Sequence, residues 1–171
     1  MNGKIFTLRN LYQSGTEKLE KAGIREAKLD AWYLLEYKTG ISRAVFLADP
    51  DREVEEEKAE SYQKDICTRA RRIPLQHITG EQEFMGLNFK VNENVLVPRQ
   101  DTEILVEEAL KRIRPDMQIL DMCTGSGCIL ESILKFGEKK QMHLKGTGCD
   151  ISEEALRKQQ PSGNRCKIYK K

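Results

Sequence analysis

The sequence predicts an α/β protein with an amino-terminal helical bundle, a β-hairpin linker and the beginning of a parallel α/β sheet. Three observations support this prediction. Apolar residues recur at helical spacing before residue 73, and the period changes to two between residues 73 and 98. After residue 117 the order is strand, glycine loop, helix, strand and acid, which is typical of a parallel sheet.

The composition limits the classes of protein to which the chain can belong. Its 171 residues, 39% of them hydrophobic, fit one ordinary domain or two small ones. Apolar runs are far shorter than the roughly 18 residues that span a bilayer, and no secretory signal is visible, so we expect a cytoplasmic protein. The net charge of +2 is too small to indicate nucleic-acid binding. The five cysteines have neither zinc-site nor disulfide spacing, so we expect reduced thiols and no metal.

Apolar residues at helical spacing predict the helices of the first segment. Residues 8–19 fit one amphipathic helix, and residues 31–35 belong to a second one that Gly40 ends. Ser42 is predicted to cap a short helix that follows. A charged helix then covers residues 53–71. Four or five short-linked helices of this kind predict a small bundle.

A change of period marks the middle of the chain. Residues 84–91 alternate around Gly86, which predicts a β-hairpin. Thr102 is predicted to cap a helix over residues 103–112, with Glu103 in its favourable first turn.

The most informative segment is a glycine-rich turn between a strand and a helix. Gln118–Met122 is a short strand, residues 123–127 read Cys-Thr-Gly-Ser-Gly, and a helical pattern covers residues 129–135. Such a turn lets a ligand approach the backbone closely and offers N–H donors at the start of the helix. A second strand, residues 143–149, ends in Asp150.

An acid at the end of the second strand can accept hydrogen bonds from both hydroxyls of a ribose. Asp150 lies 23 residues beyond Gly127 (150 − 127), close to the spacing of about 20 in dinucleotide-binding proteins. Leu130 stands where that fingerprint has its third glycine, which disfavours nicotinamide and flavin cofactors. Asp121 favours S-adenosylmethionine, because the amine of its methionine part is a cation that needs acceptors. The alternative is a turn that only connects two elements.

Four blocks of sequence carry a family resemblance. They are residues 73–84 (Ile-Pro-Leu-Gln-His-Ile-Thr-Gly-Glu-Gln-Glu-Phe), residues 97–107 with Pro-Arg-x-x-Thr-Glu, residues 121–127 and residues 149–152. Residues 73–84 resemble the interdomain signature of the HemK/PrmC family, and residues 97–107 resemble its Pro-Arg-x-x-Thr-Glu segment. Residues 121–127 resemble the cofactor loop of that family, and residues 149–152 resemble its ribose-binding strand end. Members of that family are peptide-chain release factor glutamine N(5)-methyltransferases.

The resemblance implies three parts: a helical substrate-recognition domain (1–72), a β-hairpin linker (73–98) and a partial Rossmann-like methyltransferase domain (99–171). It implies methyl transfer from S-adenosylmethionine to the glutamine side-chain amide of the Gly-Gly-Gln motif of class I release factors. Arg99 and Glu103 match positions near the family's active site. The residues that would bind the cofactor are Cys123, Thr124, Gly125, Ser126, Gly127 and Asp150.

The sequence also departs from the family. The catalytic Asn-Pro-Pro-Tyr signature does not occur in the 171 residues, so no catalytic residue is assigned and we expect the chain alone to be inactive. The pattern is lost after about Leu156, which predicts an incomplete sheet of two strands with a bare edge on the strand over residues 119–122. A frameshift or a premature stop would account for this end.

Two other functions stay open at this point. The helical domain could bind a release factor without catalysis, through the basic cluster of Arg69, Arg71 and Arg72. The chain could also be part of another S-adenosylmethionine-dependent enzyme that methylates adenine in nucleic acid. The blocks over residues 73–84 and 97–107 favour the protein substrate.

Overall fold

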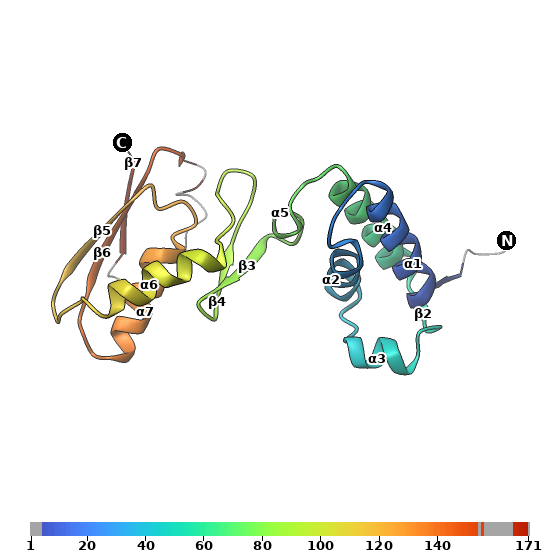
Figure 1. Ribbon diagram of the computed structural model, residues 1–171, viewed down its shortest axis with the longest axis horizontal. Coiled ribbons are helices and arrows are strands. Elements are labelled where there is room, and N and C mark those ends of the chain that lie inside the picture. The colour runs from blue at the N-terminus through green and yellow to red at the C-terminus, as the bar shows by residue number, and fades with distance from the viewer. Residues whose placement is uncertain (1–4, 154, 156–165, 171) are drawn as a thin grey trace. The chain divides into compact units, whose positions relative to one another are not determined.

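The computed structural model describes residues 5–153, 155 and, for the backbone, 166–170. It divides the chain between Thr79 and Gly80 into two compact units. The structure is mixed α/β, as the sequence predicts (Figure 1). No helix within the described ranges is long and apolar enough to cross a membrane.

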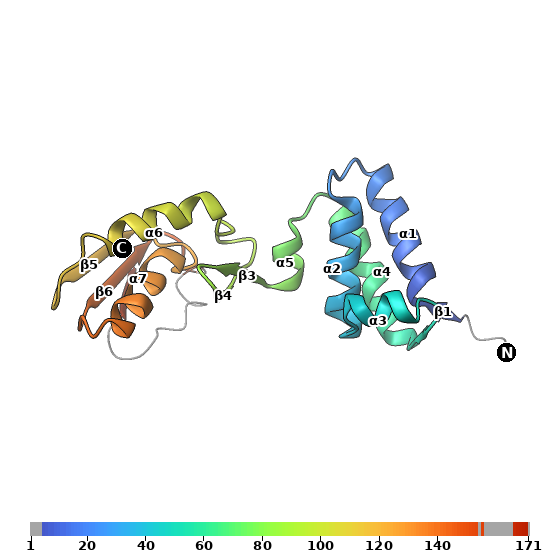
Figure 2. The ribbon, with the colours of Figure 1, turned by 60° about the horizontal axis from the view of Figure 1, so that its bottom comes forward.

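The amino-terminal unit is a helical bundle, which confirms the prediction for this segment. Helices α1, α2 and α4 pack on one another, and α5 contacts α2 and α4 (Figure 2). An antiparallel pair, β1 (Phe6–Thr7) with β2 (Glu53–Val54), joins the start of α1 to the segment before α4. The helices are α1 (Leu8–Lys21), α2 (Ala27–Thr39), α3 (Arg43–Ala48), α4 (Glu56–Ala70) and α5 (Leu75–Thr79).

Local signals in the sequence set the ends of these helices. Gly40 ends α2 in the left-handed conformation at φ 70°, which glycine adopts without strain. The Ser42 hydroxyl accepts a hydrogen bond from the Val45 N–H and caps α3. Both predictions are therefore confirmed. The unit encloses one apolar core, whose fully buried large side chains are Leu8, Leu11, Leu19, Leu34, Leu35 and Tyr62.

A largely buried ion pair joins α2 to α4. The Arg69 Nε donates to Asp30 Oδ2 at 2.7 Å, and the Asp30 residue is only 7% exposed. The same guanidinium donates to the Ile73 carbonyl at 3.0 Å, and Arg72 donates to the Ala22 carbonyl at 3.3 Å. Arg71 donates to the Thr68 hydroxyl at 3.4 Å, so all three arginines considered for docking contact other groups of the bundle.

The carboxyl-terminal unit begins with a hairpin and continues into a sheet. The hairpin pairs Glu81 with Lys90 and Phe84 with Leu87, which confirms its prediction. The three-stranded sheet is parallel, in the order β5-β6-β7. The elements are β3 (Glu81–Phe84), β4 (Leu87–Lys90), a 3₁₀ turn (Gln100–Thr102), α6 (Glu103–Leu110), β5 (Gln118–Met122), α7 (Cys128–Lys139), β6 (Lys145–Asp150) and β7 (Cys166–Lys170).

The prediction of two parallel strands is wrong, because β7 is a third. It pairs with β6 from Gly146↔Cys166 to Asp150↔Lys170, within the tail where no apolar pattern is present. Parallel pairing uses backbone groups that every residue except proline supplies, so a strand can form without an apolar signature. The bare edge is confirmed for the described sheet, in which β5 pairs with β6 alone.

The prediction that Thr102 caps α6 is also wrong. Thr102 has helical backbone angles (φ −75°, ψ −17°) and closes the preceding 3₁₀ turn. A capping side chain requires extended backbone at its own residue, so the hydroxyl cannot reach the first N–H groups of α6. It donates instead to Asp101 Oδ1 at 3.3 Å.

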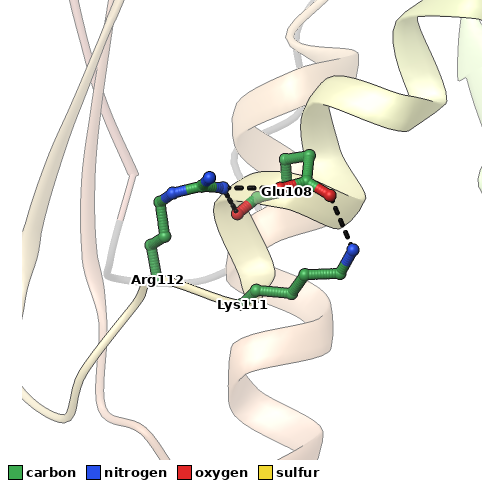
Figure 3. A network of polar contacts seen from close by, with 3 residues as sticks. All are labelled: Glu108, Lys111 and Arg112. Atoms are coloured by element: carbon green, nitrogen blue, oxygen red, sulfur yellow. Dashed lines mark hydrogen bonds and ion pairs between the residues drawn. The ribbon is translucent and has the colours of Figure 1, made fainter.

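Helix α7 packs against β5 and β6, and α6 packs against α7. Near the end of α6, Glu108 accepts hydrogen bonds from Lys111 Nζ at 2.6 Å and from Arg112 Nη1 at 2.7 Å (Figure 3). The hydrogen bond from Lys111, followed by that from Arg112, lowers the pKa of Glu108 below its ordinary value. The three side chains are exposed, so the network adds little to stability.

Replacing Arg69 tests the role of the buried ion pair. We expect Arg69→Met to lower the free energy of unfolding by about 3 kcal/mol, because it leaves the Asp30 carboxylate buried without its cation. Urea unfolding followed by circular dichroism measures this change. Arg71→Met, at an exposed neighbouring position, is the matched control and should change stability by less than about 0.5 kcal/mol. Equal effects of the two substitutions would show that the ion pair is not important.

Candidate functional site

The glycine loop over residues 123–127 lies at the carboxyl ends of two neighbouring parallel strands. It follows β5 and leads into α7, and the register pairs Met122 with Cys149. The loop therefore starts beside Asp150, the last residue of β6. Open α/β sheets bind ligands at this edge. Two features that are 23 positions apart in the sequence are thus brought together.

Asp150 holds the loop through its backbone. Its Oδ2 accepts a hydrogen bond from the Gly125 N–H at 2.7 Å, and its Oδ1 accepts one from the Ser152 N–H at 2.9 Å. An ionised carboxylate accepts about four hydrogen bonds, so this group retains capacity for a ligand. Gly125 has a φ of 55°, and a Cβ built there meets no atom within 4 Å. Open space therefore faces the backbone beside the carboxylate.

A second carboxylate lies at the end of β5. The Thr124 hydroxyl donates to Asp121 Oδ2 at 2.7 Å, and the Thr124 N–H donates to the Cys149 carbonyl at 3.0 Å. Burial raises the pKa of Asp121 above its ordinary value, and the nearby Asp150 charge adds to this rise, while the Thr124 hydrogen bond opposes it. The sequence identified both residues but could not show that Thr124 orients Asp121.

The other loop residues shape the turn into α7. Cys123 has a φ of 61° and is exposed, whereas Ser126 is half-buried. Gly127 precedes α7 at φ 79°, and its N–H donates to the Thr124 carbonyl at 2.8 Å. Burial raises the pKa of the next residue, Cys128, so its thiol stays protonated. The loop is therefore a hydrogen-bonded turn, and Gly125 and Gly127 supply its two left-handed glycine positions.

Two glycines of β6 also shape the site, and the sequence analysis missed them. A Cβ on Gly148 would lie 3.1–3.3 Å from side-chain atoms of Thr124. A Cβ on Gly146 would lie 2.7 Å from a methyl group of Leu134, so α7 could not pack as closely. The Gly-x-Gly pattern within a strand is the signal that could have identified them, because strand glycines often mark a close approach.

Glu103 and Arg99 have roles in the carboxyl-terminal unit that differ from each other. Glu103 Oε1 accepts a hydrogen bond from the Met85 N–H at 2.7 Å and so joins α6 to the hairpin turn, where Met85 has a φ of 54°. The Arg99 side chain is 68% exposed and lies 3.4 Å from Asp101. Within the described contacts, neither residue is hydrogen-bonded to the glycine loop. The described side chains also contain no cluster suited to a metal ion.

Comparison with known proteins shows a similarity in the amino-terminal unit. Residues 10–80 match the family model described as the PrmC N-terminal domain. This part of the chain is therefore similar to the PrmC N-terminal domain. The matched region includes the ion pair of Asp30 with Arg69.

Over most of its length, the chain is similar to proteins named release factor glutamine methyltransferase. The one from Caulobacter vibrioides is 37% identical over 152 residues, which cover 88% of this chain and 51% of the relative. That from Geobacter sulfurreducens is 35% identical, with 90% and 52% covered. That from Clostridium botulinum is 42% identical over 124 residues, with 71% and 44% covered. The chain thus spans about half the length of the curated relatives it matches.

The alignment with the relative from Caulobacter vibrioides includes the candidate site. A match over 88% of 171 residues necessarily contains the glycine loop, which begins 122 residues after the start and ends 44 before the last residue (171 − 127). The similarity therefore extends from the amino-terminal unit into the parallel sheet.

The raised pKa of Asp121 predicts a pH effect on stability. Between the ordinary pKa and the raised one, the folded state keeps the proton that the unfolded state has lost, so folding is penalised as pH rises through this interval. We expect the wild type to lose stability relative to Asp121→Asn as the pH rises above the ordinary carboxyl pKa of 3.8. Urea unfolding of both proteins as a function of pH measures the difference. Glu93→Gln, in an exposed turn, serves as the carboxyl-removal control. A constant difference between wild type and Asp121→Asn would contradict the prediction.

Proposed function

We propose that this chain provides the cofactor-binding part of a protein-glutamine methyltransferase that acts on class I peptide-chain release factors. The hydrogen bond from the Gly125 N–H to Asp150 is the observation that carries the proposal, because it joins a glycine loop to an acid at the edge of a parallel sheet. The names of the relatives support the reaction and the substrate. The sheet would then be the first part of a Rossmann-like methyltransferase domain.

The residues at this edge fit S-adenosylmethionine. Asp150 would accept hydrogen bonds from the ribose hydroxyls, since its carboxylate is only partly used by Gly125 and Ser152. The space in front of Gly125 would admit the ligand to the backbone. Cys123, Thr124, Gly125, Ser126 and Gly127 would line the methionine part. The cofactor supplies a methyl group activated on a sulfonium ion.

Asp121 would attract the ammonium group of the methionine part. Its raised pKa indicates that its negative charge is poorly solvated, and a cation would relieve this penalty. Thr124 would keep the carboxylate in place through its 2.7 Å hydrogen bond. Asp121 and Thr124 thus act as a charged acceptor and its positioning residue.

The substrate would be recognised elsewhere. We assign recognition of the release factor to the helical domain (1–72), with residues 73–98 as the linker and 99–171 as the partial catalytic domain. Arg99 and Glu103 remain proposed neighbours of the active site. The release-factor substrate would place the reaction in the cytoplasm. Because the 171 residues contain no Asn-Pro-Pro-Tyr, we propose that this chain binds cofactor without transferring methyl groups by itself.

Calorimetric titration of the full 171-residue chain with S-adenosylmethionine tests the cofactor site. We expect binding by the wild type and loss of binding in Asp150→Ala, which removes both carboxylate oxygens. Asp150→Asn keeps one acceptor oxygen for the Gly125 N–H and should retain part of the affinity, about tenfold weaker. Glu93→Ala is the matched control and should bind like the wild type. A folded wild type without binding would refute the cofactor site.

Transfer of radiolabelled methyl groups distinguishes the candidate reactions. We expect no label on a bacterial class I release factor incubated with this chain and S-adenosylmethionine, although the chain binds the cofactor. Label on the release factor would contradict the proposed inactivity and support the substrate. Label on adenine-containing DNA would support the nucleic-acid alternative. Capture of the release factor without cofactor binding would favour a binding module.

A further inference from the structure

One face of the parallel sheet carries apolar side chains that stay exposed. Helix α7 packs against β5 and β6 on the other face, where Ile119 joins its apolar cluster. Successive side chains in a strand point to opposite faces, so Leu120 and Met122 lie on the face away from α7. These two residues are 61% and 65% exposed. Parallel sheets normally have both faces covered, so the open face, which we define by Leu120 and Met122, lacks a layer.

The register of β5 with β6 supports this assignment of faces. Ile119 pairs with Gly146, and a Cβ on Gly146 would meet a methyl group of Leu134 in α7. This pair therefore faces the helix. Leu120 and Met122 pair with alternate residues of β6 and face the open side.

The same sheet has a bare edge at β5. Within the described sheet β5 pairs with β6 alone, so the backbone groups along its other side have no partner strand. Edge strands are usually protected by lysine, proline or other charged side chains, but β5 reads Gln-Ile-Leu-Asp-Met. Its one charged residue, Asp121, already accepts the hydrogen bond from Thr124. The composition of β5 is therefore that of an interior strand.

A single added segment would complete both the edge and the face, because crossover connections between parallel strands are right-handed. The crossover from β5 through α7 to β6 places α7 on one face as the sheet grows from β5 toward β6. A parallel strand at the bare edge lies on the opposite side of β5, so a right-handed connection to it places the connecting helix on the opposite face. That face is the one with Leu120 and Met122.

We propose that the bare β5 edge and the open face form one docking surface, which binds the unmatched half of a relative when that half is supplied as a separate polypeptide. This chain covers 51% of the relative from Caulobacter vibrioides and 52% of that from Geobacter sulfurreducens. Residues 10–80 match a domain that is N-terminal by description, so the unmatched half is the carboxyl-terminal one. Its strand would pair with β5 in parallel, and the apolar stripe of its helix would bury Leu120 and Met122.

A second copy of this chain would cover the docking surface less well. Two copies joined at their β5 edges by a two-fold axis perpendicular to the sheet would pair antiparallel, and both α7 helices would lie on the same face. Leu120 and Met122 of both copies would then stay exposed. Self-association is therefore a distinct outcome of the experiment below.

Co-expression of the full 171-residue chain with the carboxyl-terminal half of the Caulobacter vibrioides relative tests the proposal. That half carries an affinity tag, and light scattering gives the mass of the species that is purified through it. We expect a one-to-one complex. The proposal is overturned if the tagged half is insoluble, if it is purified without the chain, or if the chain associates only with itself.

Substitutions on the open face separate docking from folding. Leu120→Lys and Met122→Lys change exposed residues, so the chain should stay folded, but each would bury a charge in the complex. We expect each to reduce the recovered complex roughly tenfold. Leu47→Lys, at a 71% exposed position of the amino-terminal unit, is the matched control and should leave the recovery unchanged. Recovery at the wild-type level with both open-face variants would also overturn the proposal.

Association does not depend on the proposed function, because it is measured without S-adenosylmethionine. Methyl transfer by the purified complex to a class I release factor is a second measurement, which rests on the proposed function. Transfer by the complex but not by the chain alone would support both proposals. A complex without transfer would count against the proposed function while supporting the docking surface.

Discussion

The parallel pairing of β5 with β6 is the constraint on which the candidate site depends. The register that places Met122 beside Cys149 also places the start of the glycine loop beside Asp150. From that position the carboxylate accepts the Gly125 N–H, and Thr124 can donate to Asp121. A shift of one residue would separate these partners, since successive side chains in a strand point to opposite faces.

Close packing behind the sheet makes this register possible. Gly146 and Gly148 have no side chains, so Leu134 of α7 and Thr124 of the loop approach the β6 backbone. The amino-terminal unit depends on other interactions: an apolar core and the ion pair of Asp30 with Arg69 hold its helices together. Gly15 has a comparable effect there, since it admits the Tyr62 hydroxyl between α1 and α4. In both units a missing Cβ allows a polar group to approach a neighbouring element.

Most helices and the hairpin were predictable because their signals are local. Gly40 and Ser42 act through their own backbone and side chain, and alternation around Gly86 is sufficient to indicate two paired strands. Thr102 was mispredicted because its identity suits a cap while its backbone does not. The sequence of strand β7 has no alternation of apolar and polar residues that would predict a strand. Only its backbone pairing with β6 identifies it.

The sequence by itself determined the residue types of the site, which are a glycine loop and an acid at the end of each of two strands. It also determined the similarity to release factor glutamine methyltransferases. Only the tertiary structure decided which of these groups touch. Asp150 contacts Gly125 across 25 positions, and Lys18 contacts Cys67 across 49. The physical reason is that such contacts depend on strand register and helix packing, which bring distant residues together and leave no periodic trace in the chain.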